Sequence, residues 1–152
     1  MFSDLGSNIV LIISAATWVI TQILKVLIIL VQEKRLDWSY FLTSGGMPSS
    51  HSATVCALAT SIAMTVGLAS VYFSISVVLA VIVMYDAAGV RQSVGQHSEV
   101  LNRIVKQFKI KSTKAGIEQN FREFIGHTPF QVFIGAVLGI LISWSWVTIA
   151  AR

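Results

Sequence analysis

The chain has 152 residues, of which 55% are hydrophobic and 12% are charged, and its mean hydropathy is +0.75. Soluble domains carry about 25% charged residues, so this composition excludes an ordinary water-soluble fold and indicates an integral membrane protein. The length predicts one domain over residues 1–152. The net charge is +4, but the basic residues gather beside apolar segments, which indicates membrane orientation rather than nucleic-acid binding.

Four apolar stretches are long enough to cross a bilayer, which takes roughly 20 residues; they are 8–31, 47–67, 70–90 and 129–150. We therefore predict an all-α, polytopic membrane helix bundle with about four spanning helices. The second stretch is rich in Ala, Ser and Thr, which is typical of a helix packed among others, so we expect it to be central. Gly135 and Gly139 favour a close helix contact within one chain or between two copies of a homo-oligomer.

The loops carry most of the basic residues, in residues 33–37 and in residues 91–122. Because positive loops stay in the cytoplasm, four spans place the N- and C-termini outside the cell membrane. Residues 93–124 combine charges with apolar residues at helical spacing. This pattern predicts an interfacial amphipathic helix between the third and fourth spans.

Ionisable residues in and beside the apolar stretches lie at a similar depth in the predicted membrane. Such residues are costly in a membrane and indicate a functional site. Those at the cytoplasmic ends of the predicted spans are Lys25, His51, Asp86, Arg91 and His127. The sequence therefore predicts a site that faces the cytoplasm.

Residues 45–52 read GGMPSSHS and open the second stretch. Ser49 or Ser50 can cap a helix there, and a helix N-terminus attracts an anion. His51 would then exchange a proton near neutral pH. The alternative is a plain helix cap beside an interfacial histidine.

His127 has a similar setting, because it stands just before the fourth stretch. Two histidines at two helix starts can flank one phosphate, where one attacks phosphorus and the other protonates the leaving oxygen. The alternative is again an ordinary interfacial histidine.

The remaining charges allow two interpretations each. Lys25 and Arg91 would neutralise phosphate oxygens, or Lys25 would extend to the headgroups and Arg91 would anchor the cytoplasmic side. Asp86 would form a structural ion pair with one of these two cations, or act directly in catalysis. The three histidines and one cysteine have no metal-ligand spacing, so we predict neither a metal nor a cofactor.

Several strings resemble the phosphatidic acid phosphatase type 2 superfamily, which includes the vanadium-dependent haloperoxidases. They are PSSH at 48–51 and GHTPFQV at 126–132, and GGMPSSHSA at 45–53 with MYDAAGVR at 84–91 points to the divergent, small bacterial and plant branch. The resemblance covers residues 21–139. It implies an acid–base role for His51 and a nucleophilic role for His127, with a phosphate held by Lys25, Ser49, Ser50 and Arg91.

The chain departs from the superfamily pattern at three positions. Ser50 replaces a glycine, Phe121 stands where an arginine is usual, and Gln131 replaces an acidic residue. Gln131 can still orient His127 by a hydrogen bond, although its amide cannot stabilise an imidazolium as a carboxylate would.

A second placement of the third motif also fits. Arg91 followed after five residues by His97 has the same spacing, with Leu101 at the acidic position and Asn102 nearby. His97 is therefore a second candidate for the nucleophile. In a hybrid arrangement, Arg91 supplies the cation and His127 the nucleophile.

These observations predict a membrane hydrolase of phospholipid metabolism. It would remove phosphate from a lipid phosphate or lipid pyrophosphate through a phosphohistidine, with membrane lipids around it. Phosphatidic acid, phosphatidylglycerol phosphate and polyprenyl diphosphate fit equally. The alternative is a non-catalytic lipid-phosphate binder or scaffold, which Gln131 and the missing arginine favour. A transporter fits less well, because four spans without an internal repeat leave little room for a pathway.

Overall fold

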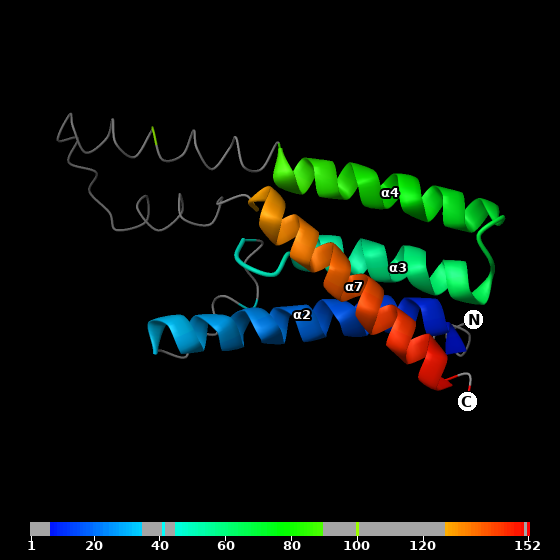
Figure 1. Ribbon diagram of the computed structural model, residues 1–152, viewed down its shortest axis with the longest axis horizontal. Coiled ribbons are helices and arrows are strands. Elements are labelled where there is room, and N and C mark those ends of the chain that lie inside the picture. The colour runs from blue at the N-terminus through cyan, green and yellow to red at the C-terminus, as the bar shows by residue number, and fades with distance from the viewer. Residues whose placement is uncertain (1–6, 35–40, 42–44, 90–99, 101–126, 151) are drawn as a thin grey trace.

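The described part of the chain is a bundle of α-helices (Figure 1). The computed structural model describes residues 7–34, 41, 45–89, 100, 127–150 and 152. Within these residues there is no strand, which confirms the predicted all-α class. The helices with assigned bounds are α2 (Ile9–Glu33), α3 (Ser50–Thr65), α4 (Val71–Ala88) and α7 (Pro129–Ala150).

Short polar side chains fix where three of these helices begin. The Asn8 side chain accepts a hydrogen bond from the Leu11 N–H at 3.1 Å and caps α2. Ser49 caps α3 in the same manner, and Ser70 caps α4 by accepting from the Phe73 N–H at 3.2 Å. Each cap satisfies a backbone donor that the first helical turn leaves without a partner, which matters most where water is scarce.

Helix α3 is the central element, as its small and polar composition predicted. It contacts α2, α4 and α7, and Ala53 and Ala57 are completely buried. At 16 residues α3 is shorter than the predicted stretch 47–67, because the segment before Ser49 is a loop rather than helix. Three described helices are long and apolar enough to span a membrane, namely Ile9–Gln32, Val71–Ala88 and Pro129–Ala150.

Helix α7 crosses α3 obliquely and very closely (Figure 1). A Cβ atom at Gly135 would overlap the Ser49 carbonyl oxygen, and one at Gly139 would overlap the Ala53 carbonyl oxygen. The absence of side chains at both glycines allows the two backbones to touch. The predicted small-residue contact therefore occurs within one chain.

Four helix ends lie toward one side of the bundle, where α2 extends well beyond the others (Figure 1). There α2 and α4 end and α3 and α7 begin, and we call this the site end. The first residue of α2 and the last residue of α7 lie at the opposite end. The amphipathic helix predicted over residues 93–124 falls outside the residues that the structure describes, except for Val100.

Candidate functional site

The starts of α3 and α7 are joined at the site end. The Ser49 N–H donates a hydrogen bond to the Gln131 carbonyl oxygen at 3.3 Å, and the Ser49 backbone lies against Gly135. Backbone contacts of this kind hold the two N-termini in a fixed relation. Both helices therefore direct the positive ends of their dipoles toward one region, where an anion is favoured.

His51 and His127 lie beside each other at this junction. Their ring centroids are 6.3 Å apart and the rings meet edge to face at 62°. His51 occupies the first turn of α3 and is half-buried, whereas His127 precedes α7 and is 1% exposed. The structure thus brings together two imidazoles that are 76 positions apart in the chain (127 − 51).

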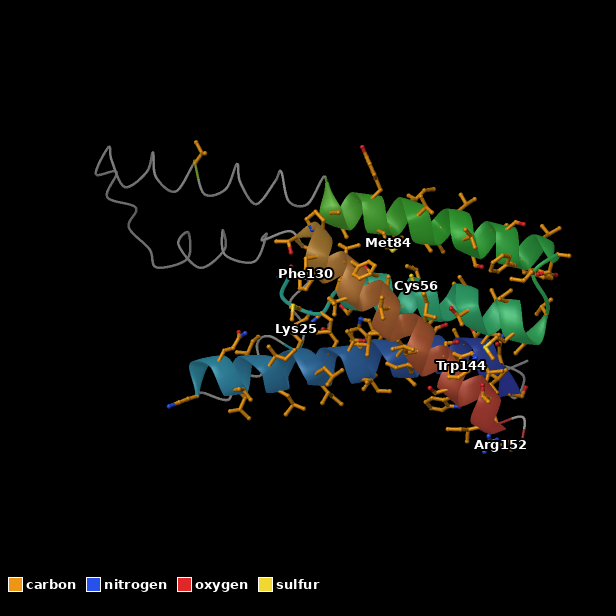
Figure 2. All side chains as sticks on the ribbon, in the orientation of Figure 1. Lys25, Cys56, Met84, Phe130, Trp144 and Arg152 are labelled. Carbon is orange, nitrogen blue, oxygen red and sulfur yellow. The ribbon has the colours of Figure 1, made fainter. Side chains whose placement is uncertain are left out.

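Lys25 reaches the same end from α2 (Figure 2). It is completely buried, and its stem passes the loop before α3, where a Cβ at Gly46 would lie 3.4 Å from the lysine Cδ. Gly46 has a φ of +89°, a conformation that other residues rarely adopt. A buried lysine is not the extended headgroup anchor that was one interpretation of the sequence, because its stem turns into the bundle.

The two serines before His51 have different surroundings. The Ser49 Oγ accepts hydrogen bonds from the Ser52 N–H at 3.4 Å and from the Ser52 hydroxyl at 3.0 Å, so it is occupied by the cap. The Ser50 Oγ is buried, and among the described residues it has no hydrogen-bond partner. The Ser50 hydroxyl is therefore the one of this pair that is available to a ligand.

Gln131 forms a capping box with Thr128 at the start of α7. Its side-chain oxygen accepts from the Thr128 N–H at 3.0 Å, and its own N–H donates to the Thr128 hydroxyl at 3.4 Å. The T-x-x-Q spacing is a known sequence signal for this arrangement. Gln131 thus stabilises the helix end that carries His127.

The other predicted residues are only partly placed. Asp86 lies in the last turn of α4, half-buried and at the site end. Arg91 and His97 fall outside the described residues, so the predicted pairing of Asp86 with Arg91 and the second placement of the nucleophile stay predictions. No group of three or more metal-binding side chains occurs among the described residues.

Gln22 is a buried residue that the sequence analysis did not single out. It is 3% exposed, and its Oε1 has no hydrogen-bond partner within the described part of the chain. It precedes Lys25 by three residues and therefore lies on the same face of α2. This three-residue spacing from Lys25 is the sequence pattern that indicates Gln22 as a further residue of the site.

Comparison with known proteins identifies the family of this chain. The family model described as "Divergent PAP2 family" matches residues 6–142. The chain belongs to the divergent PAP2 family. This divergent PAP2 protein is 38% identical over 149 residues to the "Uncharacterized membrane protein YuiD" of Bacillus subtilis (strain 168), across 92% of this chain and 94% of that protein. No solved structure matches it.

Membership fits the location of the site residues. The matched range includes Lys25, the serine pair, His51 and His127. The spans and the membrane relative together make this divergent PAP2 chain a membrane protein.

Proposed function

We propose that the protein is a lipid-phosphate phosphatase whose reaction takes place at the site end of the bundle. The observation that carries the proposal is the pair of imidazoles 6.3 Å apart at two joined helix starts, with a fully buried lysine approaching from α2. Two helix N-termini and a buried ammonium favour a bound anion, and two imidazoles supply a nucleophile and a proton donor.

A lipid phosphate suits the surroundings of this site. The helices expose large apolar side chains along their outer faces, as α4 does with Ile75, Val78 and Ile82, whereas the polar groups lie inside and at the site end. A lipid in the bilayer would present its headgroup at that level while its chains stay among other lipids. The basic residues of 91–122 support a cytoplasmic orientation for this end.

The reaction would proceed in two steps. In the first, a ring nitrogen of neutral His127 attacks phosphorus, the bond from phosphorus to the lipid oxygen breaks, and His51 gives that oxygen its proton. In the second, water attacks the phosphohistidine, His51 takes a proton from this water, and the P–N bond breaks to release phosphate. Lys25 and the helix N-termini stabilise the charge that develops on the phosphate oxygens.

The roles of the histidines follow from burial and family resemblance. His127 is almost completely buried, which shields a phosphohistidine from premature hydrolysis, whereas half-buried His51 can exchange protons with water. Gln131 keeps the start of α7 in position through its capping box.

The test is phosphate release by the purified full chain in detergent, with phosphatidic acid, phosphatidylglycerol phosphate and polyprenyl diphosphate as substrates. We expect turnover that EDTA leaves unchanged and vanadate blocks. His51→Ala and His127→Ala should each lower the rate roughly a thousandfold or more. His97→Ala is the matched control, because it removes the third histidine, and it should keep wild-type activity.

Two outcomes would change the assignment. If His127→Ala is fully active and His97→Ala is inactive, the nucleophile is His97 rather than His127. Lipid-phosphate binding without turnover on any of the three lipids supports the second candidate, a non-catalytic binder. That candidate is favoured by Gln131, because an amide in a capping box replaces the acidic residue of the superfamily pattern.

A further inference from the structure

The buried face of α2 is mainly polar, and two of its side-chain oxygens have no hydrogen-bond partner among the described residues. Its buried polar residues are Ser14, Thr17, Thr21, Gln22 and Lys25. The Ser14 hydroxyl donates to the Val10 carbonyl at 2.8 Å, and the Thr21 hydroxyl donates to the Thr17 carbonyl at 2.6 Å. The side-chain oxygens of Thr17 and Gln22 are buried without a partner in the described part of the chain, and of these two only Gln22 lies within one turn of Lys25.

A buried amide oxygen without a donor is unfavourable, and more so inside a membrane bundle where little water is present. An acceptor of this kind is retained at a functional site when a ligand supplies the donor. The position of Gln22 indicates which ligand that is.

Gln22 shares the face of α2 that carries Lys25, the proposed phosphate ligand. It is one helical turn from Lys25, about 4.5 Å farther into the bundle along the α2 axis. The Lys25 stem passes Gly46, four residues before Ser50, and α2 packs directly against α3. Ser50, in the first turn of α3, also has a buried oxygen that is without a partner among the described residues.

The chemistry of these groups is selective. The Lys25 ammonium donates hydrogen bonds and cannot accept, so it suits unprotonated phosphate oxygens. An amide oxygen only accepts, so it repels an unprotonated phosphate oxygen and attracts a P–OH. A phosphate monoester has a second pKa of about 6 and still holds a proton in part of the population near neutral pH. A sulfate ion and a phosphodiester have no such proton.

On the basis of the proposed function, we propose that Gln22 is a specificity residue that accepts a hydrogen bond from a protonated oxygen of the bound terminal phosphate. The Ser50 hydroxyl, which can donate or accept, completes the contact from α3. The site thereby selects terminal phosphate groups over phosphodiesters and sulfate. In a membrane full of phosphodiester lipids, this selection separates the substrate from the surrounding headgroups.

The experiment measures anion binding by the purified full chain in detergent, from the shift in melting temperature with inorganic phosphate or sulfate. We expect wild type to bind phosphate at least about tenfold more tightly than sulfate. Gln22→Met keeps the shape of the side chain and removes the acceptor, so it should weaken phosphate binding about tenfold and leave sulfate binding unchanged.

Thr17→Val is the matched control. The Thr17 hydroxyl oxygen is also buried without a partner among the described residues, but Thr17 lies eight residues (25 − 17) from Lys25. It should leave both affinities unchanged. Sulfate binding also reports whether the site of Gln22→Met is intact, and the wild-type preference tests the proposal without any variant.

Four results would overturn the inference. Equal wild-type affinity for phosphate and sulfate removes its basis. Equal weakening of both anions in Gln22→Met means that Gln22 donates rather than accepts, and unchanged affinities mean that it does not contact the anion. In each of these cases, vanadate-sensitive phosphate release by wild type would leave the proposed function standing. Absence of any phosphate binding together with absence of turnover overturns both.

Discussion

Helices α3 and α4 are neighbours in the chain and pack against each other, yet they differ in which residues they bury and which they expose. The buried residues of α3 are small or polar, including Ser52, Ala53 and Ser61, and it contacts three other helices. Helix α4 exposes its large apolar residues, such as Val71, Ile75 and Ile82. In lipid, apolarity does not decide what is inside a bundle. Close packing and hydrogen bonding do, and they bring small and polar residues inward.

This difference locates the chemistry of the molecule. Helix α3, whose interior face is small and polar, begins at the site end with the serine pair and His51. Helix α7 packs directly against its backbone. Helix α4 contributes the half-buried Asp86 to that end. We therefore expect substitutions at the α3–α7 contact to affect both folding and function, and substitutions on the outer face of α4 to affect neither.

The largest expected effect is at Gly139, where α7 touches the α3 backbone. Gly139→Val would force a side chain into the Ala53 carbonyl, and backbone has little room to move. We expect a loss of about 3 kcal/mol or more of stability, measured by thermal or denaturant unfolding in detergent.

Val78→Ile is the control for that substitution. It adds bulk on the outer face of α4, at a position that is 58% exposed. Its stability should stay within about 0.5 kcal/mol of wild type. If Gly139→Val proved equally mild, the close approach of α3 and α7 would not be the contact that holds the bundle together.

The central place of α3 and the meeting of Lys25, His51 and His127 at one end could be predicted from the sequence. Composition identifies a packed membrane helix, and the depth of each residue follows from its place within an apolar stretch. The T-x-x-Q spacing also predicts the capping box of Gln131, whereas the hydrogen bond from Gln131 to His127 stays a prediction.

The burial of Gln22 could be predicted from its helical spacing to Lys25, but the lack of a partner for its amide oxygen could not. Which groups meet a buried side chain depends on the neighbouring helices. Helix α3 also begins at Ser50 rather than at residue 47, because the apolar stretch predicted from the sequence includes the loop through Pro48 that leads into the helix. Both features depend on tertiary contacts.

The next effect in size compares the two N-caps. Ser49→Ala and Ser70→Ala each remove a side-chain acceptor for the first helical turn, and each should cost about 1 kcal/mol in unfolding measurements. The difference should appear in the phosphate-release assay. Ser49→Ala disturbs the turn that carries His51 and should lower turnover severalfold, whereas Ser70→Ala, at the far end of α4, should leave turnover unchanged at a temperature where both variants are folded.

A matching loss of turnover in both variants would mean that global stability, and not the geometry of the α3 start, limits the rate. The site end would then have no special dependence on the α3 cap.

The smallest effect concerns two buried serines and should differ in sign. The Ser76 hydroxyl on α4 is 3% exposed and donates to the Phe73 carbonyl at 2.8 Å, so Ser76→Ala should lower stability by about 0.5 kcal/mol. The Ser143 hydroxyl on α7 is completely buried without a partner among the described residues. Because Ser143→Ala removes a polar atom that has lost its hydration, it should raise stability by a few tenths of a kcal/mol. Paired unfolding curves in one detergent would resolve the two signs. A loss of stability in both variants would show that the Ser143 hydroxyl has a hydrogen-bond partner in the folded membrane protein. The polar interior between α3 and α7 would then extend toward the end of the bundle opposite the site.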